Sequence, residues 1–152
     1  MRKSAGILLY KWSNGALLFF LVHPGGPFWK DKDEGAWTIP KGEYGDDELP
    51  LTAALREFKE ETGTEIIGAA IALRPVKQKA GKLVTAFAIE GDIDPANIKS
   101  NHFNIQWPYK SGKWMSVPEV DQGDWFDAEA AKKKINTAQS AFIDELSQIL
   151  LH

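Results

Sequence analysis

Three glutamates stand at helical spacing within residues 50–62, where apolar residues recur with the period of an α-helix. Glu57, Glu60 and Glu61 are related by i, i+3 and i+4, so on a helix they share one face, roughly 120° from the apolar face. Like charges at these spacings repel one another and destabilise an isolated helix. Either this face is solvated, or a divalent cation turns the repulsion into chelation, because Mg²⁺ takes carboxylate oxygens as ligands.

The residues around these glutamates favour the cation. Gly42 is followed after five residues by Glu48, and after seven more by the run Arg56 to Thr64. This arrangement resembles the Nudix box, G-x5-E-x7-R-E-U-x-E-E-x-G-U with U aliphatic, and all seven fixed positions match. A chance match in the chain has a probability on the order of 10⁻⁶ at ordinary residue frequencies. Phe58 and Thr64 depart from the aliphatic positions, which are packing positions.

The resemblance implies a pyrophosphohydrolase that cleaves a diphosphate linkage in a nucleoside diphosphate bonded to another group. In the family's pattern, Glu57, Glu60 and Glu61 would bind Mg²⁺ or Mn²⁺. Gly42 would let the loop backbone pass close to the metal and could ligate it through its carbonyl. Arg56 would hold Glu57 in place by a salt bridge.

Two further roles follow from the same resemblance. Glu48 would support the connection between loop and helix by pairing with Arg56. The general base would be Glu57 or a carboxylate from a late loop, since family members often supply one there. Asp121 and Asp124 are available in that loop, but we favour Glu119.

Three segments outside the box are hypotheses for substrate binding. The run Trp37 to Gly42 resembles the W-x-x-P-K-G entry of members that act on dinucleoside polyphosphates, and of the related diphosphoinositol polyphosphate enzymes. This resemblance would place Lys41 on phosphate. Arg74 lies among several lysines of an expected hairpin, which could steer a polyphosphate or only protect a sheet edge. Tyr109 lies in an aromatic stretch that could stack on a base or pin a loop to the core.

The remaining pattern predicts the elements that position these residues. Strands are expected at 4–12 and 16–23, joined by Asn14-Gly15, and near 65–77 and 82–90. Residues 92–118 are expected to be mostly irregular, with a short strand near 113–117. Asp127 is expected to cap a helix through Lys134, and Thr137 a last helix. The apolar stripe of that last helix is expected to comprise Phe142, Leu146, Ile149 and Leu150.

This order predicts an α+β fold, an α/β/α sandwich with a mixed central sheet, in a single domain over residues 1–152. The chain has no cysteine, which excludes disulfides and thiolate metal sites, and no apolar run near the ~20 residues of a membrane helix. A net charge of −3 argues against a dedicated nucleic-acid binder. A cytoplasmic enzyme with small nucleotide partners is expected, and the sequence leaves its oligomeric state open.

The expected substrate is a dinucleoside polyphosphate such as diadenosine tetraphosphate. ADP-ribose, a nucleotide sugar, an oxidised nucleoside triphosphate and a diphosphoinositol polyphosphate are alternatives within the family. A catalytically silent nucleotide-binding module is the alternative of another class, although a pure binder has no need of three clustered carboxylates.

Overall fold

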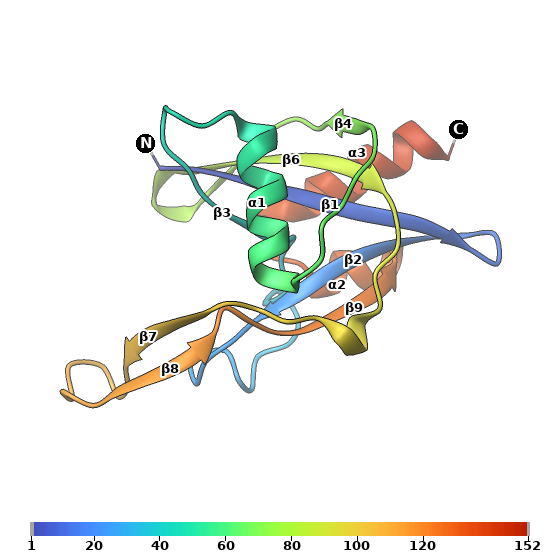
Figure 1. Ribbon diagram of the computed structural model, residues 1–152. Coiled ribbons are helices and arrows are strands. Elements are labelled where there is room, and N and C mark those ends of the chain that lie inside the picture. Colours follow the sequence, from blue (N-terminus) through green and yellow to red (C-terminus); the bar gives the residue numbers. More distant parts are fainter. Residues whose placement is uncertain (1, 152) are drawn as a thin grey trace.

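The computed structural model describes residues 2–151, and its centre is a twisted mixed sheet of seven strands (Figure 1). The strands follow the order β4-β6-β1-β2-β9, with β3 added beside β1 and β5 beside β6. β1 and β6 run parallel, and the other pairs are antiparallel. The strand bounds are β1 Lys3–Ser13, β2 Ala16–Pro24, β3 Lys41–Glu43, β4 Ala70–Ala72, β5 Val76–Gln78, β6 Lys82–Glu90 and β9 Val120–Asp127.

Helices cover both faces of this sheet, as the α+β sandwich prediction requires. Helix α1 (Pro50–Thr62) lies on one face, and helices α2 (Ala128–Lys134) and α3 (Ser140–Leu150) lie on the other (Figure 1). Neighbouring residues of β1 alternate between the two cores, so Leu8 packs on the α3 side and Leu9 on the α1 side. Short 3₁₀ turns occupy Lys79–Gly81, Pro95–Asn97 and Thr137–Gln139.

Helix α1 begins and ends where the sequence predicts. Pro50 stands in its first turn, where a missing N–H costs nothing, and Gly63 ends it in the left-handed region at φ 79°. The Gly63 N–H donates to the Lys59 carbonyl at 2.7 Å. Phe58 is fully buried against Phe20 of β2, with ring centroids 6.2 Å apart. This contact presses one side of the helix onto the sheet and leaves the glutamate side facing the loops.

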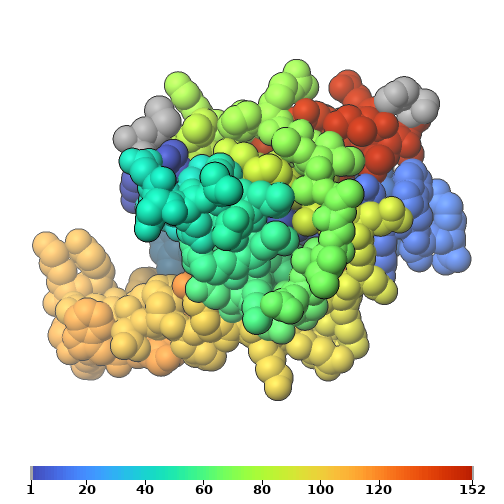
Figure 2. Space-filling view, turned by 45° about the horizontal axis from the view of Figure 1, so that its top comes forward, coloured from blue at the N-terminus to red at the C-terminus, as the bar shows by residue number. Residues whose placement is uncertain are grey.

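A separate hairpin extends from the sandwich. It consists of β7 (His102–Gln106) and β8 (Trp114–Pro118), which pair only with each other among the described residues. Its tip projects beyond the body of the molecule in both overall views (Figures 1 and 2). Both ends of the hairpin return to the sandwich beside the C-terminal end of α1.

Several elements differ from the sequence prediction. β7 lies in the stretch expected to be irregular, and β9 was not expected, because its polar sequence with Gly123 has weak strand propensity and pairing with β2 decides its conformation. The expected strand over 65–77 is broken into β4 and β5 around Pro75, which has no N–H to donate. Ile149 is 40 % exposed and does not belong to the core stripe.

The caps of the last two helices agree in part. Asp127 caps α2 as predicted, because its side chain accepts the Ala130 N–H at 2.9 Å. At the last helix the capping side chain is Asn136 and not Thr137, since Asn136 accepts the Ala138 N–H at the start of the preceding 3₁₀ turn. Within residues 2–151, no helix is both long and apolar enough to span a bilayer.

Candidate metal centre

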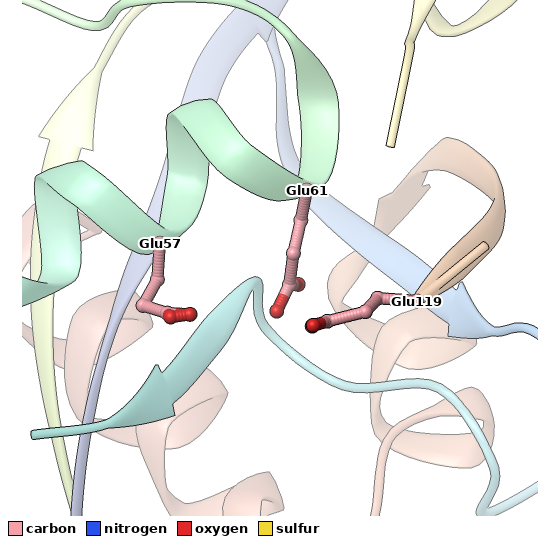
Figure 3. Close-up of side chains that lie close together, drawn as sticks. All are labelled: Glu57, Glu61 and Glu119. Atoms are coloured by element: carbon pink, nitrogen blue, oxygen red, sulfur yellow. The ribbon is translucent and has the colours of Figure 1, made fainter. Parts of the chain in front are cut away.

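Three carboxylates converge beside the sheet (Figure 3). Oxygens of Glu57, Glu61 and Glu119 all lie within 4.8 Å of one another. Glu57 and Glu61 are one helical turn apart on α1, and Glu119 is the single residue between β8 and β9. We call these three residues the carboxylate cluster. Glu57 and Glu61 are buried, with 8 % and 5 % of their surfaces exposed.

Asn101 explains how Glu119 reaches a helix that lies far away in sequence. The Asn101 N–H donates to the Glu60 carbonyl at 2.8 Å, and its carbonyl accepts the Glu119 N–H at 3.0 Å. The Asn101 side chain also donates to the Glu119 carboxylate at 3.3 Å. One residue therefore joins the last turn of α1 to the third carboxylate, and nothing in the sequence identifies it.

Gly42 makes room for the cluster. A Cβ at this position would lie 2.1 Å from the carboxylate atoms of Glu57. The backbone of Gly42 is paired with Ala5 of β1, so it has no freedom to retreat from the carboxylate. Glycine is therefore required here by the close approach between this backbone and the Glu57 carboxylate.

Arg56 binds the acidic residues around the helix. Its Nε and Nη2 donate to the two Glu48 oxygens, each at 2.9 Å, which is a bidentate pair. Its Nη1 lies 3.3 Å from Glu57 and 3.1 Å from Glu60. The pairing expected between Glu48 and Arg56 is present, and so is the salt bridge from Arg56 to Glu57.

Glu60 stands apart from the other two box glutamates. Its carboxylate is turned to Arg56 and is outside the carboxylate cluster, although it is close enough to Glu57 to raise the pKa of that residue. The structure thus brings Gly42, Glu57, Glu61 and Glu119 together, whereas the Glu60 carboxylate lies outside this group.

Burial makes this arrangement costly without a cation. Loss of hydration raises the pKa of Glu57 to about 7, the Glu60 charge adds to the effect, and Arg56 opposes it. Burial likewise raises the pKa of Glu61 well above its usual range, and the charges of Glu57 and Glu119 add to this shift. Clustered carboxylates of this kind are a donor set that fits a hard divalent cation.

The three residues that the sequence suggested for substrate binding lie in different parts of the structure. Lys41 lies next to the cluster: burial and the Lys82 charge lower its pKa, whereas the charges of Glu61, Glu43 and Glu57 raise it. Arg74 is not brought to the cluster, because it is held to Glu145 of α3 on the opposite face of the sheet. Tyr109 lies near the tip of hairpin β7–β8 and is 82 % exposed.

Comparison with known proteins identifies the family of this chain. The NUDIX domain family model matches residues 1–146, so the chain belongs to the Nudix family and is a hydrolase of phosphoanhydride bonds. The comparison with curated proteins found no match.

Solved structures agree on the fold. The binary complex of Ap4A hydrolase from C. elegans has a TM-score of 0.69 and 22 % identity, and the match covers 99 % of this chain and 98 % of that one. The NUDIX domain of Shewanella oneidensis NrtR, complexed with ADP ribose, has a TM-score of 0.66 and 14 % identity, covering 97 % and 87 %. The MutT protein from Methanosarcina mazei Go1 has a TM-score of 0.65 and 19 % identity, covering 99 % and 96 %.

Proposed function

We propose that this enzyme hydrolyses a dinucleoside polyphosphate, with diadenosine tetraphosphate as the leading substrate. The observation that carries the proposal is a buried carboxylate cluster with Lys41 beside it. The sequence before Gly42 supports a polyphosphate, because it resembles the entry of family members that act on dinucleoside polyphosphates. The full-length likeness to a C. elegans Ap4A hydrolase adds support for this branch.

We further propose Mg²⁺, or Mn²⁺ in its place, as the cofactor. Glu57, Glu61 and the Gly42 carbonyl would hold it, and Glu60 would join them by turning its carboxylate away from Arg56. When bound, the cation would neutralise charge on the diphosphate oxygens and make water a stronger nucleophile.

The chain's own residues then have separate tasks. Arg56 fixes Glu57 through their salt bridge, and Glu48 fixes Arg56 through the bidentate pair. Glu119 accepts the proton of the attacking water, because it is the least buried carboxylate of the cluster and Asn101 holds it in place. Lys41 binds the phosphate next to the cleaved linkage. We place the enzyme in the cytoplasm, with small nucleotides and neither nucleic acid nor membranes as partners.

Product analysis in ¹⁸O-labelled water tests the proposal. Diadenosine tetraphosphate, ADP-ribose, a nucleotide sugar, an oxidised nucleoside triphosphate and a diphosphoinositol polyphosphate are each incubated with enzyme and Mg²⁺. We expect mononucleotide products from diadenosine tetraphosphate, with the label showing which phosphorus is attacked. Turnover of ADP-ribose alone would replace the leading substrate, and no turnover with either metal would favour a silent nucleotide-binding module.

A further inference from the structure

Large aromatic side chains are exposed around the hairpin β7–β8. Phe28 is 53 % exposed, Phe103 42 %, Trp107 40 % and Tyr109 82 %. All four line one apolar hollow of about 320 Å³, which lies between residues 25–29 and the hairpin β7–β8. A gathered set of exposed aromatic rings marks a binding site more often than isolated exposed residues do.

One face of the hairpin forms a wall of this hollow. Phe103, Ile105 and Trp107 alternate along the chain and therefore project from the same face, and all three line the hollow. Trp114 is paired with Gln106, and although Gln106 also borders the hollow, Trp114 is not among the residues that line it. Trp114 is therefore a control for Trp107, because it belongs to the same hairpin but does not line the hollow.

Residues 25–29 form the opposite wall. Phe28 and Trp29 pack edge to face with ring centroids 5.0 Å apart, so their surfaces are held in a fixed relation. Lys32 Nζ lies 4.1 Å from the centre of the Phe28 ring, which adds a cation to this wall. We call the space between these walls the aromatic slot.

The slot adjoins the backbone segment that carries Glu119, because Gly25 lines the slot and is bonded to the Glu119 backbone. The Gly25 N–H donates to the Glu119 carbonyl at 3.0 Å, and a Cβ on Gly25 would lie 2.1 Å from the Pro118 carbonyl oxygen. Phe103 pairs with Val117, two residues before Glu119, which corresponds to ~7 Å along the strand. A ribose and its phosphate span a comparable length, so a base in the slot would present its phosphates to the cluster.

We propose that the aromatic slot binds a nucleobase of the substrate between the rings of Phe28 and Trp29 on one wall and the ring of Trp107 on the other. This inference rests on the proposed function, because it assumes that the bound phosphates belong to a nucleotide. An aromatic floor with lysines at its edge suits a flat base on an anionic chain better than it suits an apolar peptide. The slot accounts for Tyr109 as a substrate-binding residue and adds a second wall, which the sequence did not indicate.

Binding is tested first without any turnover. AMP is titrated into ¹⁵N-labelled protein while the indole N–H signals of the tryptophans are followed by NMR. We expect the Trp29 and Trp107 signals to shift and the Trp114 signal to stay, whereas ribose 5-phosphate, which lacks the base, moves none of them. Equal shifts of Trp114, or identical effects of the two compounds, would overturn the slot.

Variants separate the slot from the chemistry. F28A and W107A change opposite walls, and each should weaken AMP binding roughly 5- to 150-fold, the range of one stacked base. W114A should leave AMP binding unchanged. The NMR spectrum of each variant reports whether the hairpin is intact, and F28A remains informative if W107A disorders it. Because AMP binding needs no hydrolysis, an enzyme inactive on every polyphosphate would still confirm or refute the slot.

Discussion

The carboxylate of Glu57 occupies the space where any side chain at Gly42 would begin: a Cβ there would lie 2.1 Å from its atoms. Both residues are fixed, Gly42 by its ladder with β1 and Glu57 by its helix and by Arg56. The short distance between Gly42 and the Glu57 carboxylate is therefore fixed by the surrounding structure. Adding one methyl group at position 42 tests it.

Gly42→Ala should reduce kcat roughly 100-fold, since a displacement of about 1 Å in a catalytic group costs that much. The added methyl pushes Glu57 away from its neighbours without touching the core. Steady-state kinetics with the preferred substrate measures the effect. Gly45→Ala is the matched control, because its Cβ would meet only the flexible Asp47 side chain, at 3.1 Å. Wild-type kinetics in Gly42→Ala would contradict the close approach.

Asn101→Ala should lower kcat roughly tenfold, as expected for the loss of one hydrogen bond to a charged group. The backbone bonds to Glu60 and Glu119 survive this change, so only the side-chain contact with the Glu119 carboxylate is removed. KM should change little, because the contact that is removed holds the proposed base and not the substrate. Asn97→Ala, which breaks a surface contact with Asp94, should change neither quantity.

Arg56→Lys should lose much of the activity although the charge is kept, because an ammonium does not reproduce the bidentate pair with Glu48. A decrease in kcat/KM of roughly tenfold is expected. If Glu48 acts only through Arg56, the double variant with Glu48→Gln should be no worse than Arg56→Lys alone. Additive losses would show that Glu48 has a separate task.

Stability without metal should fall as pH rises from about 4.5 to about 7. Glu57 has its pKa raised to about 7, so in this interval the folded chain binds more protons than the unfolded chain. Mg²⁺ requires the ionised carboxylates, so the increase in Tm that it causes should grow over the same interval. Thermal unfolding in EDTA and in Mg²⁺ at several pH values measures both trends, and Glu57→Gln should flatten them. A stability that rises with pH in EDTA would contradict the raised pKa.

The sequence predicted those parts of the site that lie on one element. Helical spacing alone placed Glu57 and Glu61 on one face, and local rules placed the ends of α1 at Pro50 and Gly63. The grouping of Glu119 with them depends on pairing between distant segments, and the sequence offered it only as one of three late carboxylates. Asn101 was missed because its role consists of backbone hydrogen bonds, which every residue type can make.

The strands show the same division. β1 and β2 follow from alternating apolar residues and an Asn-Gly turn, which are local signals. β9 has aspartates and a glycine where strand formers are usual, and it is a strand because the open edge of β2 needs a partner. Ile149 looked like a core residue from its spacing, but it lies near the end of α3 and 40 % of its surface is exposed.

The attachment of Asn101 to the end of α1 also means that the carboxylate cluster is completed by segments late in the chain. A growing chain can form α1 early, but Glu119, the third carboxylate, follows β7 and β8 in the sequence. It can join α1 only after this hairpin has formed. A chain that has folded only as far as α1 therefore contains the family motif but not the complete carboxylate cluster.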